Sequence, residues 1–392
     1  MKILFVFTDL KFGGIQRVLQ LLIEEFSQME KYKIYLALFN NIQNIPVNAE
    51  IIDLKAPRTK NGFLLILNFI KGVVRLNKIV KEKNIDIILS RSYTISSIVL
   101  LAKKFYKWKI PVIASHHNNL KKAVKDLGFL GVIAKKYAVK FQDVADKILC
   151  VSKGIENELV NNGINRDKLI TIYNPLKIDK INLMSKEKIN SEHEFIFDKK
   201  FKIIISAGRL VEQKNFQLLI ESYIKIDKKI KSRLVILGDG PDKSKLEKLI
   251  IDNNQQENIY LLGGQENPFK YFKRSDLFVL TSNWEGFGNV ILEAMACNIP
   301  IISTDCQFGP NEIIQNNVNG ILVPVNDKLK LSKAMSKVLL EASYAKKLSS
   351  KGKQRSLDFS INKIVPQYEK LINEVLQKHN NAIKNKTAAN NE

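Results

Sequence analysis

Length, composition and charge exclude several classes of protein at once. The chain has 392 residues, of which 45% are hydrophobic and 26% charged, which suffices for two or three domains with buried cores and excludes collagen-like or broadly disordered chains. Three cysteines (Cys150, Cys297, Cys306) are too few for a disulfide framework, so we expect a reducing compartment and no structural zinc site. The formal net charge of +23 favours phosphate-rich partners.

Short apolar runs rich in β-branched residues alternate with longer helical patterns in both halves of the chain. Such near-continuous apolar strands are typical of parallel sheets covered on both faces by helices. The sequence therefore predicts an α/β protein with two doubly wound, Rossmann-like domains that face each other across a cleft. The expected strands are residues 2–7, 33–38, 85–89, 112–114, 147–151 and 169–172, then 202–206, 233–237, 259–262, 277–280, 300–303 and 320–323.

Composition also suggests where the domains begin and end. We expect an N-terminal domain over residues 1–173, a polar linker over 174–200 and a C-terminal domain over 201–360. An apolar helical period predicts a helix over 361–377 that crosses back to the first domain, and the Asn- and Lys-rich residues 378–392 predict a disordered tail. The amino-terminal apolar run is too short for a signal peptide, and no run reaches the length of a membrane span.

Two features of the first half come after expected strands. Gly13 and Gly14 come after the first strand, where paired glycines let backbone N–H groups approach a phosphate; the alternative is a purely structural turn. His116 follows the strand at 112–114, where a histidine can contact a substrate hydroxyl or the reacting centre. The alternative for His116 is a buried structural histidine.

The positive charge is concentrated in one quarter of the chain. Between Lys55 and Lys153 there are 21 lysines and arginines against 5 acidic residues. Residues 120–141 combine lysines with apolar side chains, and Tyr106 and Trp108 lie among further lysines, a pattern that suits a surface resting on anionic lipid. The alternative is a core helix with a solvated basic face. The charge also admits a nucleic-acid-binding protein, although no nucleic-acid module is recognised.

The second half carries two motifs that favour a diphosphate ligand. Arg209 and Lys214 lie five positions apart after the strand at 202–206, where a guanidinium and an ammonium can hold one diphosphate; the alternative is a pair of solvated cations. Glu285 and Glu293 flank a glycine-containing turn that opens a helix, whose N-terminus favours an anion. The alternative there is a surface loop and an ordinary helical glutamate. The turn at residues 238–241 is expected to shape the same sheet edge.

The order of these motifs resembles glycosyltransferase family 4, a family of retaining enzymes with the GT-B fold. The resemblance spans nearly the whole chain, and residues 303–324 are similar to members that build O-antigens, capsules and lipid-linked glycans. The matching pieces are Gly13-Gly14, His116, Val151-Ser152-Lys153, Tyr173-Asn174-Pro175, Gly208-Arg209-Leu210 with Lys214-Asn215, Gly238-Asp239-Gly240-Pro241, and Glu285 with Glu293-Ala294-Met295-Ala296. Gln16 departs from the family, where many members carry an acidic residue.

The resemblance implies a role for each matching position. Arg209 and Lys214 would hold the diphosphate, Glu285 the donor sugar and Glu293 the ribose. Gly14 would touch the distal phosphate, and His116 would contact the transferred sugar near its anomeric carbon. The implied catalytic residues are His116, Arg209, Lys214 and Glu285, and the implied donor-binding residues are Gly13, Gly14, Gly208, Gly286, Phe287, Gly288, Asn289, Val290 and Glu293.

The resemblance further implies a hexosyltransferase that moves a hexose or N-acetylhexosamine from a nucleotide-diphosphate sugar, expected to be a UDP-sugar, to a lipid-linked, lipopolysaccharide or capsule glycan. No Asp-x-Asp triplet occurs, so we expect no metal and no cofactor.

A retaining glycosidase needs two carboxylates about 5 Å apart. No second carboxylate is evident on the first-domain side of the cleft, so we expect front-face substitution. We expect no nucleic-acid partner and a bacterial, cytoplasmic location, peripheral on the inner face of the cytoplasmic membrane. A GT-B nucleotide-sugar epimerase is the alternative activity.

Overall fold

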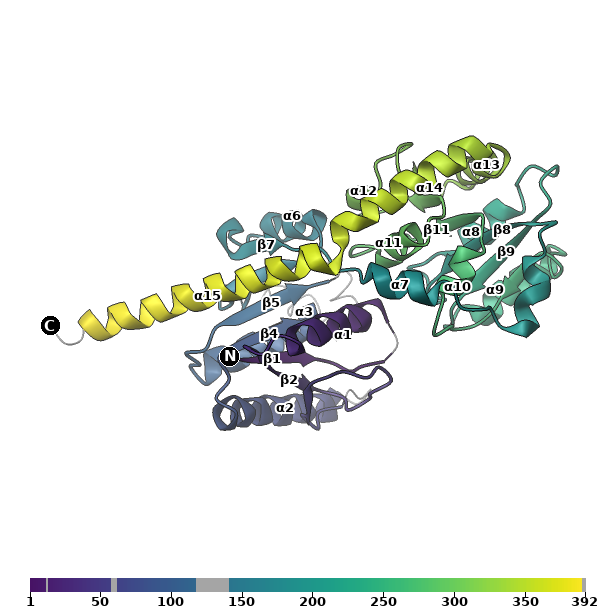
Figure 1. Cartoon of the computed structure of the whole chain (residues 1–392). Coiled ribbons are helices and arrows are strands. Elements are labelled where there is room, and N and C mark those ends of the chain that lie inside the picture. The colour runs from purple at the N-terminus through teal and green to yellow at the C-terminus, as the bar shows by residue number, and fades with distance from the viewer. Residues whose placement is uncertain (12, 58–61, 118–140, 390–392) are drawn as a thin grey trace. The chain divides into compact units, whose positions relative to one another are not determined.

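A computed structural model describes residues 1–11, 13–57, 62–117 and 141–389 of the chain. The chain divides into two compact units, Met1–Pro175 with Asn362–Glu392 and Leu176–Ile361. Each unit contains one fully parallel sheet with helices beside it, and each can be followed by its labels in Figure 1. The two parallel α/β sheets confirm the predicted fold class.

The first unit contains a seven-stranded sheet with the order β3-β2-β1-β4-β5-β6-β7. Its five inner strands are almost wholly buried, as expected for a parallel sheet covered on both faces, whereas the edge strands β3 and β7 are partly exposed. Its described elements are β1 (Lys2–Phe7), α1 (Gly14–Ser27), β2 (Lys33–Leu38), β3 (Glu50–Asp53), α2 (Gly62–Glu82), β4 (Ile87–Arg91), α3 (Tyr93–Phe105), β5 (Val112–His116), β6 (Lys147–Cys150), α6 (Lys153–Asn161), η1 (Arg166–Lys168), β7 (Leu169–Thr171) and most of α15 (Ile361–Ala389).

The second unit contains a six-stranded sheet with the order β10-β9-β8-β11-β12-β13. Isoleucine, leucine and valine side chains of β8, β9 and β11 pack in one apolar core with those of α8 and α13. Its elements are α7 (Ile178–Met184), η2 (Ser191–Phe197), β8 (Lys202–Ala207), α8 (Phe216–Tyr223), β9 (Ser232–Leu237), α9 (Lys243–Asp252), β10 (Ile259–Leu261), α10 (Phe269–Lys273), β11 (Leu277–Leu280), α11 (Asn289–Ala296), β12 (Ile301–Thr304), α12 (Pro310–Ile313), β13 (Ile321–Val323), α13 (Lys328–Leu340), α14 (Ala342–Ser356) and η3 (Leu357–Phe359).

Three segments differ from the sequence expectation. The edge strand β3 was not expected, because one of its four residues is exposed, the other three are half-buried, and it carries no long apolar run. The expected linker is ordered and belongs to the second unit from Leu176 onward, where Ile196 and Phe197 of η2 are buried. The last helix continues to Ala389, through residues expected to be a disordered tail, although its described residues beyond 380 are exposed.

Each sheet has one switch point, a pair of neighbouring strands from which the chain continues toward opposite edges of the sheet. In the first unit it lies between β1 and β4, and in the second between β8 and β11. In open parallel sheets, ligands bind outside the carboxyl ends of the strands at such switch points. A ligand site is therefore expected at the loops after β1, β8 and β11.

Candidate functional site

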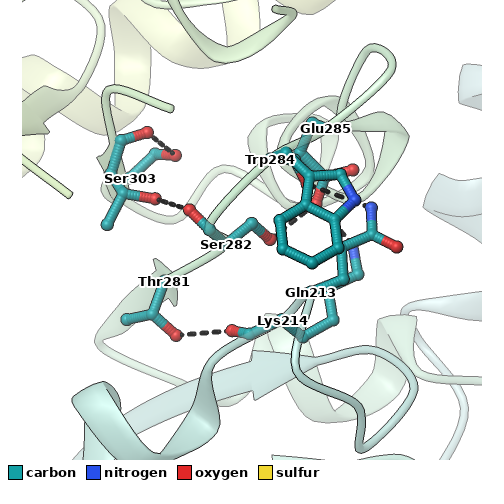
Figure 2. Close-up of polar contacts among 8 residues, drawn as sticks. Gln213, Lys214, Thr281, Ser282, Trp284, Glu285 and Ser303 are labelled. Carbon is teal, nitrogen blue, oxygen red and sulfur yellow. Dashed lines mark hydrogen bonds and ion pairs between the residues drawn. The ribbon is translucent and has the colours of Figure 1, made fainter. Parts of the chain in front are cut away.

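The two loops at the switch point of the second unit meet through a buried ion pair. Lys214, in the loop after β8, lies with its Nζ 2.5 Å from Oε1 of Glu285, in the loop after β11. Their side chains are only 16% and 8% exposed. The Ser282 hydroxyl donates to the same Oε1 at 2.6 Å. Figure 2 shows the three side chains converging from the two loops, so two predicted catalytic residues, 71 positions apart, share one site.

Hydrogen bonds to the backbone fix both loops. Thr281 Oγ1 donates to the Lys214 carbonyl at 2.9 Å, and Thr304 Oγ1, at the end of β12, donates to the Ser282 carbonyl at 2.7 Å. The Gln213 amide donates to the Trp284 carbonyl at 3.0 Å (Figure 2). Because the contacts join β11, β12 and the loop after β8, the ion pair is held by the sheet itself.

Glycines let neighbouring backbone segments approach this site. A Cβ on Gly208 would lie 3.2 Å from Cε of Lys214, so the lysine side chain lies against this glycine. Gly238 has φ +147, and a Cβ there would lie 1.8 Å from the Gly208 carbonyl oxygen. Similarly, Gly309 has φ +85, and a Cβ there would lie 2.0 Å from the Phe287 carbonyl oxygen. The turn at Gly238 thus shapes the edge on which Lys214 lies, in the role expected for it.

The glycine-containing turn after Glu285 leads directly into α11. Gly288 has φ +97 and caps the helix, a left-handed conformation that glycine adopts without steric cost. Phe287 is buried against Phe359, with ring centroids 5.6 Å apart. Asn289 and Val290 form the first turn and Glu293 is half-buried in the second. Gly286 is buried as well. The helix tip and Glu285 therefore belong to one continuous loop, as predicted.

Arg209 differs from Lys214 although the two share a loop. Its side chain is exposed, and it makes no described ion pair or hydrogen bond. An exposed guanidinium remains available to an incoming anion, whereas Lys214 is already paired with Glu285. It therefore stays a prediction that Arg209 and Lys214 bind one diphosphate together.

The predicted residues of the first unit lie at the carboxyl edge of its sheet. Gly14 is the first residue of α1, the helix that follows β1, and Gly13 caps that helix. His116 ends β5 and is almost fully buried. Its Nε2 lies 3.0 Å from Oε1 of Gln142, and its ring lies 5.0 Å from that of Tyr93. Burial lowers the pKa of His116 to about 4, so the imidazole is neutral at physiological pH.

The same edge holds buried polar groups that the sequence analysis did not identify. Arg91, at the end of β4, is 1% exposed and lies beside the Tyr368 hydroxyl of α15. Its Nε and Nη2 have no hydrogen-bond partner within the described part of the chain. Burial lowers the pKa of Arg91, and burial together with the charge of Arg91 holds the pKa of His117 well below its ordinary value.

These omissions have identifiable causes. Arg91 stands at the end of an apolar strand, and a charged residue there is a usable signal. Ser282 follows the strand β11, whereas nothing in the sequence around Gln142 distinguishes it. Within the described residues, no three His, Cys, Asp or Glu side chains gather in a way that could hold a metal ion. No described helix is both long and apolar enough to cross a bilayer.

Comparison with known proteins assigns the family. Residues 12–180 match the model of glycosyltransferase family 4, and residues 187–355 match that of glycosyl transferases group 1. A glycosyltransferase of Methanocaldococcus jannaschii is 31% identical in an alignment of 368 positions that covers 83% of this chain and 88% of that protein. The chain is a glycosyltransferase of family 4.

Other relatives of this glycosyltransferase agree. A Campylobacter jejuni N-acetylgalactosaminyltransferase that acts on a diphospho-undecaprenol-linked sugar is 28% identical, covering 90% of this chain and 94% of the relative. The structure of Anabaena HepE with UDP-glucose superposes with a TM-score of 0.78 at 18% identity, covering 95% of this chain and all of that one. The lipopolysaccharide galactosyltransferase WaaB superposes at 0.71 with 22% identity, covering 95% and 99% of the two chains. These structures share the GT-B fold with the glycosyltransferase.

Proposed function

We propose that this glycosyltransferase moves a hexose or N-acetylhexosamine from a UDP-sugar to a lipid-linked, lipopolysaccharide or capsule glycan, with retention of the anomeric configuration and without a metal ion. The observation that carries the proposal is the buried Lys214–Glu285 pair at the switch point of the second unit. A cation and a carboxylate in one site can serve the two halves of a nucleotide sugar, its diphosphate and its hydroxyls.

The pair retains donors and acceptors for a ligand. The Lys214 ammonium has three N–H donors, and one of them is engaged by Glu285. Glu285 receives Lys214 and Ser282 on Oε1, and no described residue donates to its Oε2. Lys214 can therefore bind a phosphate oxygen without leaving Glu285, while Oε2 accepts from a sugar hydroxyl. Arg209, exposed on the same loop, supplies a second cation.

The proposed reaction needs charge stabilisation more than a nucleophilic side chain. The bond between the anomeric carbon and the phosphate oxygen breaks, and the leaving UDP gains negative charge that Lys214 and Arg209 stabilise. The acceptor oxygen bonds to the anomeric carbon on the face that UDP leaves, and its proton passes to the departing phosphate oxygen. His116, kept neutral by burial, contacts the transferred sugar and orients it.

The choice of donor and acceptor rests on the relatives. HepE binds UDP-glucose, and the Campylobacter jejuni relative transfers N-acetylgalactosamine to a diphospho-undecaprenol-linked sugar. WaaB is a lipopolysaccharide outer core galactosyltransferase. The bound ligand of HepE and the activities of the other two relatives support a UDP-sugar donor and an acceptor carried on a lipid.

The test is UDP release by the full-length enzyme across a panel of UDP- and GDP-sugars, with and without undecaprenyl-diphosphate-linked glycans. We expect release that requires acceptor, survives EDTA and gives a product of unchanged anomeric configuration. Lys214→Met and Arg209→Ala should each lower kcat/KM about 100-fold or more, because each removes a cation from the leaving group. Lys248→Met, which breaks an exposed ion pair with Asp252 in the same unit, is the control. Release of free UDP without acceptor contradicts the transfer.

We also propose that the enzyme rests on an anionic membrane through its first unit. The surface expected from residues 120–141 lies largely outside the described residues. Trp108, which was also expected on a lipid-facing surface, is instead buried, and its Nε1 donates to Asn77 of α2 at 2.8 Å. Support comes from α2 itself, whose apolar side chains are 36–51% exposed at Leu64, Leu67, Ile70 and Val74. Basic side chains of the same helix are Lys71, Arg75, Lys78 and Lys81.

An exposed apolar row beside basic residues suits the interface of an anionic bilayer. We expect flotation with vesicles that contain phosphatidylglycerol and much weaker flotation with phosphatidylcholine vesicles. The double variant Ile70→Glu with Val74→Glu should abolish flotation. The control, Leu329→Glu with Leu340→Glu, places the same charges on exposed leucines of α13 in the second unit. Equal binding to both lipids, or by both variants, contradicts the proposal.

A further inference from the structure

Ser282 lies beside both residues of the ion pair in the second unit. It follows Thr281 at the end of β11 and is fully buried. Its hydroxyl donates at 2.6 Å to Oε1 of Glu285, the oxygen that also accepts from Lys214 Nζ at 2.5 Å. Figure 2 shows Ser282 and Lys214 approaching Glu285 from different loops. One carboxylate oxygen is thus saturated by two donors.

The position of Ser282 is itself fixed by the sheet. Thr304, the last residue of β12, donates from Oγ1 to the Ser282 carbonyl at 2.7 Å. Strands β11 and β12 pair in register directly before this point. The serine hydroxyl therefore stands at the rigid end of two strands, whereas Glu285 lies in the loop that follows.

A carboxylate without such contacts turns easily about its last side-chain bond, because that torsion is broad and roughly two-fold. Two donors on one oxygen hold the group in one orientation. Lys214 alone does not suffice, because its ammonium is at the end of a flexible four-carbon chain and is also shared with the phosphate in the proposed reaction. Ser282, with a single side-chain torsion and full burial, is the rigid one of the two donors.

We propose that Ser282 is a positioning residue for the transferred sugar: its hydroxyl holds Oε1 of Glu285 so that Oε2 faces the donor and accepts from a hydroxyl of the hexosyl group. The proposal rests on the proposed function, because it assumes a nucleotide-sugar donor at Glu285. It assigns Ser282 to recognition of the sugar and not of the nucleotide. The ligand class is a hexose or N-acetylhexosamine with a hydroxyl group within reach of that oxygen.

Ser282→Ala separates this role from a purely structural one, because UDP lacks the sugar. We expect the variant to bind UDP-sugar roughly 10-fold more weakly than the wild type, in the range for a hydrogen bond to a charged group, and to bind UDP equally well. The value of kcat/KM should fall at least as far. Ser282→Cys, which keeps a weak donor, should recover part of the loss.

Ser222→Ala is the matched control. Ser222 is also fully buried in the second unit, and its hydroxyl also makes a 2.6 Å hydrogen bond, to the carbonyl of Leu218 in α8. It should leave the ratio of UDP-sugar to UDP affinity unchanged. In a double-mutant cycle, Ser282→Ala should have little further effect on UDP-sugar affinity once Glu285→Gln is present.

The outcomes are distinguishable by calorimetric titration of UDP and of the UDP-sugar preferred by the wild type. A wild type that binds no nucleotide sugar overturns the proposed function. A wild type that binds, with an unchanged affinity ratio in Ser282→Ala, overturns the role of Ser282 alone. An equal loss for UDP and UDP-sugar also overturns it, because the serine then supports the whole loop.

Discussion

Replacing His116 should change how the stability of this enzyme depends on pH. Burial lowers the pKa of His116 to about 4 in the folded protein, against an ordinary value of 6.5. The unfolded chain therefore takes up a proton between these values that the folded chain excludes. A histidine with a depressed pKa contributes stability above pH 6.5, and the contribution is lost as the pH falls toward 4.

The magnitude follows from the two pKa values. One pKa unit corresponds to about 1.4 kcal/mol, so the whole contribution of His116 is about 3.5 kcal/mol. Most of the measurable change falls between pH 7 and pH 5, where linkage gives a loss of about 2 kcal/mol. Gln142 opposes the shift, since its Oε1 accepts a hydrogen bond from Nε2 and so favours the protonated ring, but desolvation is the larger cause.

The measurement is urea unfolding of the wild type and of His116→Gln at pH 7, 6 and 5. The wild type should lose about 2 kcal/mol more than the variant between pH 7 and pH 5. NMR of the histidine-labelled protein, with four histidines to resolve, should show the His116 signal unchanged down to pH 5. Parallel stability curves, or a His116 signal that titrates near pH 6.5, would refute the burial argument.

Two further predictions concern backbone contact and buried charge. Gly238→Ala should lower the free energy of unfolding by about 3 kcal/mol and weaken donor binding, because its Cβ would overlap the Gly208 carbonyl. Gly263→Ala, at φ +69 in open space, is the control and should lower the free energy of unfolding by about 1 kcal/mol. Equal losses of the two variants in urea unfolding contradict the contact. Arg91→Met should raise the free energy of unfolding by about 1 kcal/mol, because it removes a buried charge that has no carboxylate partner within the described residues. A large decrease in the free energy of unfolding in the same assay would show that Arg91 is paired in solution.

Much of the fold could be predicted because parallel strands carry a local signal. Apolar runs such as residues 2–7 and 277–280 coincide with β1 and β11, since strands buried on both faces need continuous apolar side chains. The four-residue edge strand β3 is half-exposed and carries no such run. The structured segment before β8 was mistaken for a linker because its burial depends on contacts with distant residues, such as the hydrogen bond from Asn267 to the carbonyl of Met184.

Sequence alone determined which loops form the candidate site. The carboxyl ends of parallel strands share one edge of the sheet, so motifs that follow neighbouring strands such as β8 and β11 lie together there. Only the tertiary structure decided how the side chains pair. Lys214 and Ser282 meet on one oxygen of Glu285, and Trp108 is buried where an exposed membrane contact was expected. Such pairings depend on rotamers and burial, which are set by packing between residues far apart in the chain and leave no local pattern.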